Sequence, residues 1–453
     1  MKVKVLSRSH DDFVRQTKHD IHKVERNYSP HLHPFETNRE YKRAVNAVKM
    51  DRMFAKPFLC SLDGHSDIVQ CLAKHPTRLS VLLSGAANGE LKLWNLADRK
   101  CLDIIDGHNS IVRQICVPLH GRYFFSVGDQ TIKQWPFRES YDDVMNTTRS
   151  VNSSSSPMNT LISQTVVHGM DCHRTKPLLI TCGESVDLWE ETRTQPLRTY
   201  KWGSDSVSCV KFNPIETDLC AGAASDRSIQ IYDTRRSEPL RKVIMKMRTN
   251  SLAWNPMEAF VFTAANEDSD LYTFDLRNLK AAQQVHKDHV AAVIDVDYSP
   301  TGREFVSGSY DKTVRIFGTE MGRSRDVYHT KRMQRLTAVL WSADNKYLVS
   351  ASDEMDIRLW KAYASEKLGL KSFREQSAAD YNQKLMDKFG NHPEVRRIAR
   401  HRHVPKHVMH ASKEKRDIVG AIKRKEGNRR LHSKPGTVGF ESERTKSIVS
   451  EEQ

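Results

Sequence analysis

Histidine, serine and aspartate stand near one another at several points in the sequence, and together they can form a hydrolytic triad. His108, Ser126 and Asp129 are one such set, in which serine would attack, histidine would take its proton and aspartate would orient the histidine. A catalytic triad occurs once in an enzyme, whereas this combination recurs down the middle of the chain at near-constant spacing. The repetition indicates a structural motif, because catalysis must be argued from one site and its geometry.

Other sequence signatures of catalysis do not occur in the chain. The sequence contains no G-x-x-x-x-G-K-[ST] phosphate loop, no H-E-x-x-H zinc motif and no G-x-S-x-G nucleophile turn. We therefore predict a protein that is not an enzyme and uses no cofactor.

A short segment of alternating apolar and polar residues, ending in an aromatic residue, recurs along the middle of the chain. The seven aromatic positions are Trp94, Trp135, Trp189, Tyr232, Phe274, Phe317 and Trp360. Successive positions are 41, 54, 43, 42, 43 and 43 residues apart. A period of about 40–45 residues with a terminal aromatic is typical of propeller blades with four strands each. The sequence thus predicts an all-β, seven-bladed β-propeller of the WD-repeat type.

Two further columns keep the same phase. Six residues before each aromatic position stand Asn88, Asp129, Gly183, Asp226, Asp268, Asp311 and Glu354. Histidine opens several repeats, at His65, His108, His289 and His329. In such a repeat we expect the aspartate to point inward and accept hydrogen bonds from turn amides and the histidine, with a Ser/Thr hydroxyl and the Trp indole completing the network. The third repeat, with Gly183 in the acidic column, is the weakest.

The blades must form a closed ring, because a single blade cannot bury both faces of its sheet. We expect residues 54–62, just before the first Gly-His pair, to supply the outer strand of the last blade and so close the ring. The long step between Trp135 and Trp189 indicates an insertion at about 141–160. Its four consecutive serines predict a flexible surface loop, and both a tolerated insertion and a phosphorylation site remain open there.

The net charge of +15 lies entirely in the two ends of the chain. Residues 1–50 hold 11 Lys/Arg and 6 Asp/Glu, residues 361–453 hold 22 and 12, and residues 51–360 hold 38 of each. We accordingly divide the chain into a basic, irregular N-terminal arm (1–50), a neutral propeller (51–360) and a basic helical C-terminal domain (361–453). Basic ends on a neutral core are typical of proteins that bind an acidic partner such as nucleic acid.

The eight cysteines, Cys60 to Cys220, include no C-x-x-C pair. This usage favours reduced thiols in the cytosol or nucleus over a zinc ribbon or a disulfide framework. No apolar run reaches the length of a membrane helix, and no apolar stretch follows the first basic residues as a secretory signal would require. We expect a soluble intracellular protein that does not interact with a membrane.

The C-terminal region predicts three helices. Residues 365–389 have apolar residues near helical spacing, Pro393 would begin a second helix, and a third would run from about Lys413 to Leu431. Residues 394–434 hold 14 Lys/Arg against 4 Asp/Glu and carry the whole C-terminal excess of positive charge.

Three interpretations of these cations remain open: RNA binding, a nuclear-import signal, and a solvated surface without a partner. No aromatic residue lies between Phe389 and Phe440, which favours contact with the phosphate backbone over base stacking. The candidate RNA-binding residues are Arg396, Arg397, Arg400, Arg402, Lys406, Lys423, Arg424, Lys425, Arg429 and Arg430.

Four histidines in the same region, His401, His403, His407 and His410, have the composition of a zinc site. No cysteine lies nearby, Pro405 interrupts the one pair with helical spacing, and the surrounding cations oppose metal binding. We predict no metal site and expect a basic surface that gains further charge below pH 7.

Several segments resemble those of the Sof family of nucleolar WD-repeat proteins. Four of them are residues 27–36 (NYSPHLHPFE), 54–58 (FAKPF), 254–260 (WNPMEAF) and 264–268 (AANED). Residues 397–406 (RIARHRHVPK) and 432–436 (HSKPG) resemble the C-terminal domain that defines this family. The resemblance covers nearly the whole chain, and the tail is more specific than any WD repeat.

The resemblance implies a component of the small-subunit processome, the nucleolar assembly that folds and cleaves pre-ribosomal RNA with a guide small nucleolar ribonucleoprotein. Its expected partners are therefore pre-ribosomal RNA, processome proteins and that ribonucleoprotein, and its expected location is the nucleolus of the nucleus. The function implied is a non-catalytic scaffold in small-ribosomal-subunit biogenesis.

Vertebrate-like members of the family are also regarded as substrate receptors of the cullin-four RING ubiquitin ligase, and such a receptor is the alternative function. Receptors of this kind dock on the ligase adaptor through an aromatic-Asp-x-Arg box at the end of a blade strand. Two segments here are similar, Tyr232-Asp233-Thr234-Arg235 and Phe274-Asp275-Leu276-Arg277, each with Tyr or Phe where the box has Trp. The alternative role of each arginine is to cap the turn of its own blade.

Overall fold

The computed structural model describes residues 30–137, 156–434 and 436–452 of the 453-residue chain. Most of the insertion expected at 141–160, and the first 29 residues of the expected N-terminal arm, lie outside these ranges. The chain forms two compact units. The propeller unit contains residues Ala55–Leu368 and the chain from Arg402 onward, and a helical unit contains the chain up to Phe54 together with Gly369–His401.

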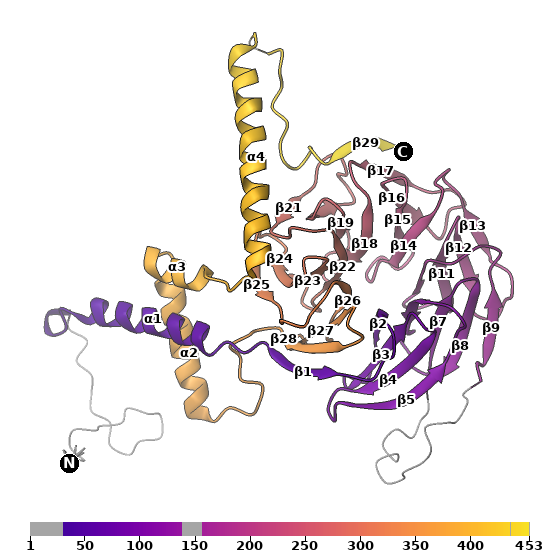
Figure 1. Ribbon diagram of the computed structural model, residues 1–453, viewed down its shortest axis with the longest axis horizontal. Coiled ribbons are helices and arrows are strands. Elements are labelled where there is room, and N and C mark those ends of the chain that lie inside the picture. The colour runs from indigo at the N-terminus through magenta and orange to yellow at the C-terminus, as the bar shows by residue number, and fades with distance from the viewer. Residues whose placement is uncertain (1–29, 138–155, 435, 453) are drawn as a thin grey trace. The chain divides into compact units, whose positions relative to one another are not determined.

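Seven antiparallel sheets form the propeller and are arranged radially, with the first strand of each sheet innermost (Figure 1). From inner to outer strand, the first blade contains β2 (Val69–Lys74), β3 (Val81–Ala86), β4 (Glu90–Asn95) and β5 (Lys100–Asp106), and the second contains β6 (Val112–Cys116), β7 (Tyr123–Gly128), β8 (Thr131–Pro136) and β9 (Asn159–Ile162). The third blade contains β10 (Gly169–Cys172), β11 (Leu178–Cys182), β12 (Val186–Glu190) and β13 (Arg198–Tyr200). The fourth contains β14 (Val207–Phe212), β15 (Leu219–Ala224), β16 (Ser228–Asp233) and β17 (Arg241–Met245). The other three are β18 (Thr249–Trp254), β19 (Val261–Asn266), β20 (Asp270–Asp275), β21 (Gln284–Lys287); β22 (Val293–Tyr298), β23 (Glu304–Ser309), β24 (Val314–Gly318), β25 (Ser324–Tyr328); and β26 (Leu336–Trp341), β27 (Tyr347–Ser352), β28 (Ile357–Lys361), β1 (Phe58–Leu62). The predicted seven-bladed propeller is confirmed.

The ring closes through strand β1. It pairs antiparallel with β28, with Leu62 opposite Ile357 and Phe58 opposite Trp360. The N-terminal segment thus supplies the outer strand of the last blade, as the sequence predicted, and joins residues about 300 positions apart. Because β1 is followed directly in the chain by β2 of the first blade, its pairing in the last blade joins the two ends of the ring.

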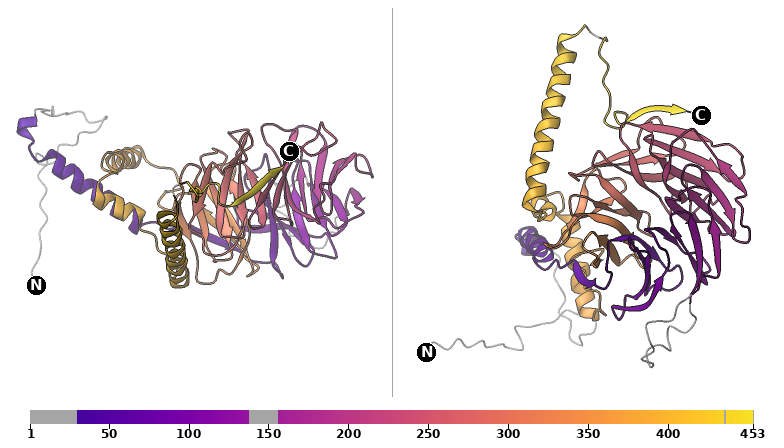
Figure 2. Two further views of the ribbon diagram at one scale, coloured as in Figure 1. Left: turned by 90° about the horizontal axis from the view of Figure 1, so that it is seen from above. Right: turned by 45° about the vertical axis from the view of Figure 1, so that its right-hand side comes forward.

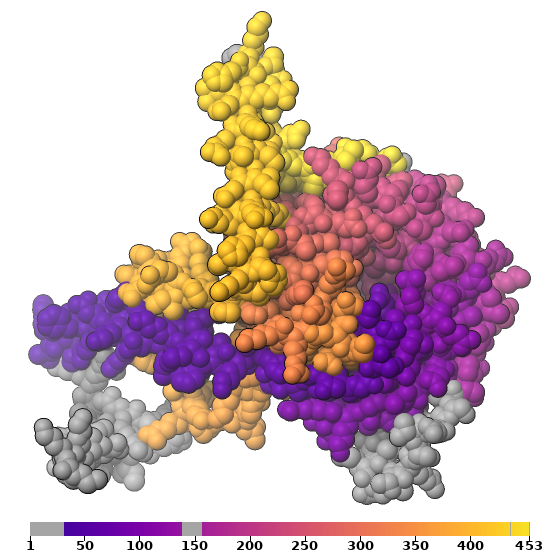
Figure 3. All heavy atoms as spheres, in the orientation of Figure 1, coloured from indigo at the N-terminus to yellow at the C-terminus, as the bar shows by residue number. Residues whose placement is uncertain are grey.

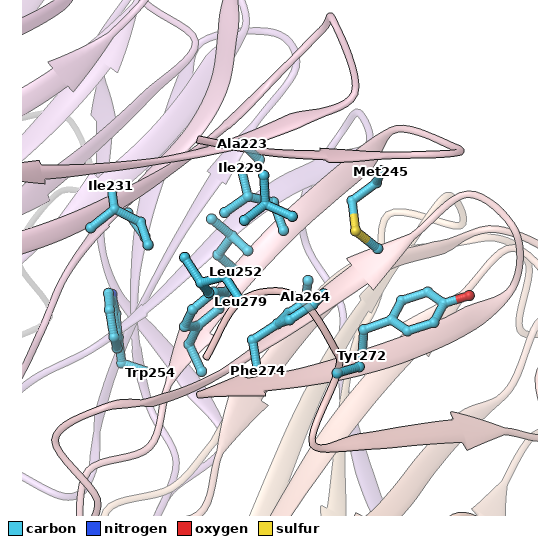
Figure 4. Close-up of a cluster of buried hydrophobic side chains, with 14 of the residues drawn as sticks. Ala223, Ile229, Ile231, Met245, Leu252, Trp254, Ala264, Tyr272, Phe274 and Leu279 are labelled. Carbon is cyan, nitrogen blue, oxygen red and sulfur yellow. The ribbon is translucent and has the colours of Figure 1, made fainter. Parts of the chain in front are cut away.

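Apolar residues of neighbouring blades pack against each other to form the core. The largest cluster joins the fourth and fifth blades, where Ile229 and Ile231 of β16 meet Leu252 and Trp254 of β18 (Figure 4). Burying one such side chain stabilises a protein by about 1.5–3 kcal/mol. The blades are thus held to one another by apolar packing, whereas backbone hydrogen bonds join the strands within each sheet.

The repeated histidines and serines form buried hydrogen-bonded sets. His65 Nε2 lies 2.6 Å from Ser84 Oγ, to which the Trp94 indole donates at 2.8 Å. In the next blade His108 Nε2 lies 2.7 Å from the Ser126 hydroxyl, to which the Trp135 indole donates at 2.9 Å. Each serine hydroxyl is thus already engaged by two rings and lies inside the blade, as a structural network requires.

The acidic column differs from the prediction in the first two blades. Asp311 is buried, and His289 bridges it at 2.8 Å and Ser307 at 2.7 Å. Asn88 and Asp129 are exposed, and Asp129 takes a φ of 50°, which suits the apex of a tight turn. The expectation of an inward-pointing residue is therefore wrong for these two blades, because the turn that carries each one directs it to solvent.

Two cysteines correct the prediction that all thiols are reduced. Cys116 ends β6 and Cys172 ends β10, and these inner strands of adjacent blades bring the two Cα atoms to 6.2 Å, where they form a disulfide. The cysteines lie 56 residues apart, so their spacing in the sequence could not show that they meet. The remaining six cysteines are unpaired thiols.

The helical unit contains a 3₁₀ turn, η1 (Pro30–Leu32), and the helices α1 (Glu36–Met53), α2 (Phe373–Lys388) and α3 (Pro393–Arg400). Its core joins Val45 and Val48 of α1 to Val395 of α3. The Tyr41 hydroxyl donates to Glu394 at 2.5 Å, and Lys388 pairs with Glu40 at 2.6 Å.

The expected irregular arm is thus a helix from residue 36, and α1 crosses the domain boundary expected at 50/51. The apolar face of α1 has its partner about 350 residues away, so the segment looks unstructured in isolation. Helix α3 begins at Pro393, as predicted.

Helix α4 (Lys406–His432) and strand β29 (Ile448–Glu452) belong to the propeller unit. The first turns of α4 lie on the propeller and its later turns extend away from it, as two views show (Figures 1 and 2). The chain then returns, and β29 pairs with β17 as a fifth strand of the fourth blade. Helix α4 begins seven residues before the expected start at Lys413, because Val408 is buried and extends the apolar face toward Pro405.

The buried histidines predict acid-labile folding. Burial lowers the pKa of His65, His108 and His286 to about 4, each from a value near 6.5 in an unfolded chain. Between these two pKa values the unfolded state binds more protons than the folded state. The free energy of unfolding should therefore have its full value above pH 7 and fall as the pH drops from 6.5 toward 4, by up to about 3 kcal/mol per histidine. Urea unfolding at pH 7.5, 6.0 and 5.0, followed by tryptophan fluorescence, measures the loss.

The variant H108Q is the control for this prediction. It lowers stability at every pH, yet it should bind up to one proton fewer on unfolding between pH 6.5 and 4. An unchanged pH dependence in H108Q would show that His108 is not held neutral by the fold.

Candidate functional site

Three candidate RNA-binding arginines share the outer side of helix α3. Arg396, Arg397 and Arg400 are exposed, while Val395 is buried in the core of the helical unit. Residues 396 and 400 stand one turn apart on a helix, so their guanidinium groups project on the same side. This short helix therefore offers three planar cations, the shape that binds phosphate oxygens with two hydrogen bonds at once.

Arg402, two residues further along, has a different environment. Its side chain is 18% exposed, its Nε lies 3.2 Å from Asp326 Oδ1, and it donates a hydrogen bond to the carbonyl of Arg325. Both partners belong to β25, so Arg402 fastens the start of the α4 segment to the sixth blade. The guanidinium group of this candidate is thus already occupied by contacts within the propeller unit.

Lys415 is a second anchor of α4, and the sequence did not single it out. Its ammonium group lies 3.0 Å from Asp270 Oδ1 and 3.4 Å from the carbonyl of His289, and it also donates to Ser269. Its three acceptors lie in two different loops of the propeller. In the sequence it is one lysine in a charged run, and nothing in its spacing distinguishes it from its exposed neighbours.

The remaining candidates lie on α4 and are exposed to different degrees. Lys406, Arg424, Lys425 and Arg429 are exposed. Lys423 pairs with Glu443 of the returning chain, and the Arg430 guanidinium stacks over Phe440 at 5.0 Å. Figure 3 shows this part of α4 rising from the body of the propeller. The structure therefore divides the candidates between two units, with 396, 397 and 400 in the helical unit and the others in the propeller unit.

Two of the four histidines considered for zinc contact the propeller. His403 Nδ1 lies 3.2 Å from His329 Nε2 and the rings stack, while His407 lies 3.4 Å from the carbonyl of Asp311. Burial, with the neighbouring histidines, lowers the pKa of His329. Within residues 30–137, 156–434 and 436–452, no group of three His, Cys, Asp or Glu side chains is arranged to hold a metal ion.

The two candidate adaptor boxes have the same geometry in adjacent blades. Arg235 donates two hydrogen bonds of 3.0 Å to Asp233, and Arg277 donates two hydrogen bonds of 3.1 and 2.8 Å to Asp275. The side chains of both arginines are nonetheless 65–69% exposed. The Arg277 guanidinium holds the pKa of the Asp275 carboxyl below its usual value and lies 5.2 Å from the Phe260 ring. Each arginine thus caps its own turn and still presents a face of its guanidinium to solvent.

Strand β20 shows that the boxes and α4 use opposite faces of the propeller. Asp270, at its first residue, binds Lys415 of α4, and Asp275, at its last residue, binds Arg277 of the second box. A strand of this length spans about 17 Å, so the two contacts lie at opposite ends of the blade. A partner on the boxes and a partner on α4 would therefore not compete for the same surface.

None of the helices in the described part of the chain is long and apolar enough to cross a membrane.

Comparison with known proteins defines the class of this protein. The WD domain, G-beta repeat, matches residues 56–95, 99–136, 194–233, 281–318 and 327–361, and the Sof1-like domain matches residues 362–448. The repeats that end at Trp189 and Phe274 lie outside the matched ranges. The repeat that ends at Trp189 is also the one with the weakest match to the repeated positions in the sequence, because it has Gly183 in the acidic column. The chain is thus a WD-repeat propeller protein with a Sof1-like C-terminal domain.

Full-length relatives then identify the family. The chain is 54% identical over 452 residues to DDB1- and CUL4-associated factor 13 of Homo sapiens and 55% identical over 450 residues to the protein of that name in Danio rerio, with 99% of each chain covered. It is 41% identical over 466 residues to Protein SOF1 of Saccharomyces cerevisiae, covering 99% of this chain and 94% of the yeast protein. The chain belongs to the family of Protein SOF1 and DDB1- and CUL4-associated factor 13, so the predicted membership of the Sof family is confirmed.

The ion pair of Arg402 predicts how α4 is held. In R402A, the amides of residues 406–416 should exchange with deuterium about 10-fold faster, because a partly buried carboxylate loses one of its partners and the helix start detaches more often. Exchange measured by mass spectrometry tests this, with R400A, an exposed arginine two residues earlier, as the control. Equal exchange rates in R402A and the unaltered chain would show that Arg402 is not an anchor.

Proposed function

We propose that the protein is a non-catalytic scaffold in small-ribosomal-subunit biogenesis, where it acts within the small-subunit processome and supports pre-rRNA processing in the nucleolus. The observation that carries the proposal is the exposed arginine set of α3, Arg396, Arg397 and Arg400, on a chain whose propeller has no net charge. Membership of the family of Protein SOF1 supports it.

Several features support a binding role over a catalytic one. The serines that a hydrolase would need are buried and bonded to Trp and His rings, as Ser84 and Ser126 illustrate. A nucleophile must reach its substrate, and these hydroxyls do not reach the surface. The partners proposed are pre-ribosomal RNA, processome proteins and a guide small nucleolar ribonucleoprotein, which places the protein in the nucleus and nucleolus.

The chemistry of the RNA contact follows from the kind of side chain present. Arginine forks bind phosphate oxygens, each contact displaces condensed counterions, and affinity therefore falls with salt. The α3 arginines and the exposed cations Lys406 and Arg424 of α4 carry this contact. Arg402 is left out of the set, because Asp326 already pairs with it.

A second function has its own observation. The two boxes present Arg235 and Arg277 with equal geometry in neighbouring blades, on the propeller face opposite α4, and several relatives are named DDB1- and CUL4-associated factors. This supports a substrate receptor of a cullin-four ligase, with Asp233 and Asp275 orienting the two arginines toward the ligase adaptor. Because the faces differ, both functions can reside in one molecule.

Charge reversal on α3 tests the RNA contact. The triple variant R396E/R397E/R400E should bind pre-ribosomal RNA at least 10-fold more weakly at 150 mM salt and show a salt slope lower by about two to three, since each phosphate contact contributes 0.7–0.9 to that slope. Filter binding of the full chain across a salt series measures both values.

The matched control reverses three exposed cations of the propeller, R78E/K100E/K331E, and so changes the net charge equally. Its affinity should fall much less than that of the α3 variant. Point changes are preferable to deletion of 394–434, which would remove the buried Val395 and Val408. Equal losses of RNA affinity in both triple variants would show that net charge, and not a contact at α3, determines the binding.

Replacing the box arginines tests the second function. R235A/R277A should lower capture of the purified ligase adaptor DDB1 at least 10-fold, with little change in thermal stability, because exposed ion pairs contribute about 0–1 kcal/mol. The control is R193A/R323A, which removes two exposed arginines that also pair with carboxylates. Undiminished capture by R235A/R277A would exclude the boxes as the docking site.

A further inference from the structure

The outer half of helix α4 carries a stripe of four exposed side chains. Ile418 is 61% exposed and Ile422 is 49% exposed, while Lys425 and Arg429 follow one and two turns later and are also exposed. The positions are spaced by four, three and four residues, which places all four on one side of an α-helix. The stripe therefore runs from an apolar pair to a basic pair, and we name it the 418–429 stripe.

The contacts that hold the outer half of α4 use another side of the helix, whereas Lys415 of the first half lies on the side of the stripe, two turns before Ile422. The returning chain meets Lys423, Glu426 and Arg430, through Glu443, Lys446 and Phe440. At 100° per residue, these three positions lie about a quarter-turn from the 418–429 stripe. The propeller holds the first half of the helix, at Val408 and Lys415. Among the described residues, those holding α4 in place thus leave the stripe open to solvent.

A third side of the helix carries three exposed cations. Lys406, Lys413 and Arg424 are exposed and fall within about 20° of one another around the axis, nearly opposite the 418–429 stripe. Phosphate contact needs only cations, so this side and the arginines of α3 suffice for RNA. Two exposed isoleucines gain nothing from a phosphate backbone, whereas a protein surface with an apolar strip would bury them.

We propose that the 418–429 stripe docks an acidic amphipathic segment of another protein. Its apolar residues would cover Ile418 and Ile422, and carboxylates one to two turns further along would pair with Lys425 and Arg429. Charge complementarity identifies the partner as acidic, and the succession of two apolar and two basic positions at helical spacing identifies it as an amphipathic helix. The inference rests on the proposed scaffold function and names one protein contact within it.

Site-specific cross-linking tests this inference in the full chain. A photoreactive benzoylphenylalanine at position 422 should attach to one protein in isolated pre-ribosomal particles, and the attached peptide should contain apolar residues followed by carboxylates. The charge reversal K425E/R429E should lower the yield at least 10-fold, and reversing the partner's carboxylates to lysine should restore it. The position control is benzoylphenylalanine at 431, where Leu431 is 80% exposed on another side of α4.

Matched variants separate loss of docking from loss of folding. I418S/I422S changes two exposed residues of similar helix propensity, so its thermal midpoint should stay unchanged while docking is lost. R78E/K100E reverses two exposed cations of the propeller and should leave the adduct at 422 intact. An adduct to RNA, an adduct to a second copy of this chain, or equal adducts at 422 and 431 would overturn the inference.

The failure of this inference can be told apart from that of the proposed function. If I418S/I422S still co-sediments with pre-ribosomal particles and position 422 forms no adduct, the docking segment is wrong and the scaffold function stands. If the unaltered chain does not co-sediment with these particles at all, the scaffold function itself is wrong.

Discussion

The antiparallel pairing of β1 with β28 is the constraint on which the rest of the propeller depends. Each blade buries its faces only against its neighbours, so an open ring would expose the inner face of its first and last blades. Residues 58–62 close that gap from the N-terminal side of the chain. Such a non-local contact is costly in chain entropy, and it is offset by packing between all seven blades.

Within the closed ring, polar groups serve to hold strands in place. His65, His108 and His289 each reach a buried serine, and burial keeps the histidines neutral near pH 7. The same requirement, that buried polar groups be paired, explains why the histidines and serines recur in several blades at similar spacing.

The positive charge of the C-terminal region is only partly consumed by the fold. Arg402 and Lys415 bind carboxylates of the propeller and fix the first half of α4. Most of the other cations of α3 and α4 remain exposed, which is where the proposed RNA and protein contacts lie. Lys415 holds α4 at the turn that begins β20, whereas the second arginine box lies at the other end of that strand, so the two kinds of partner have separate faces.

The sequence by itself determined the number of blades, the strand that closes the ring, the family and the start of α3 at Pro393, because each is written in local periodicity or in a short motif. Only the tertiary structure decided which cations are available. Arg400 and Arg402 stand two residues apart in one basic run, yet one faces solvent and the other pairs with Asp326. It also paired Cys116 with Cys172 and gave α1 its partner α3, since exposure and pairing depend on residues far away in the chain.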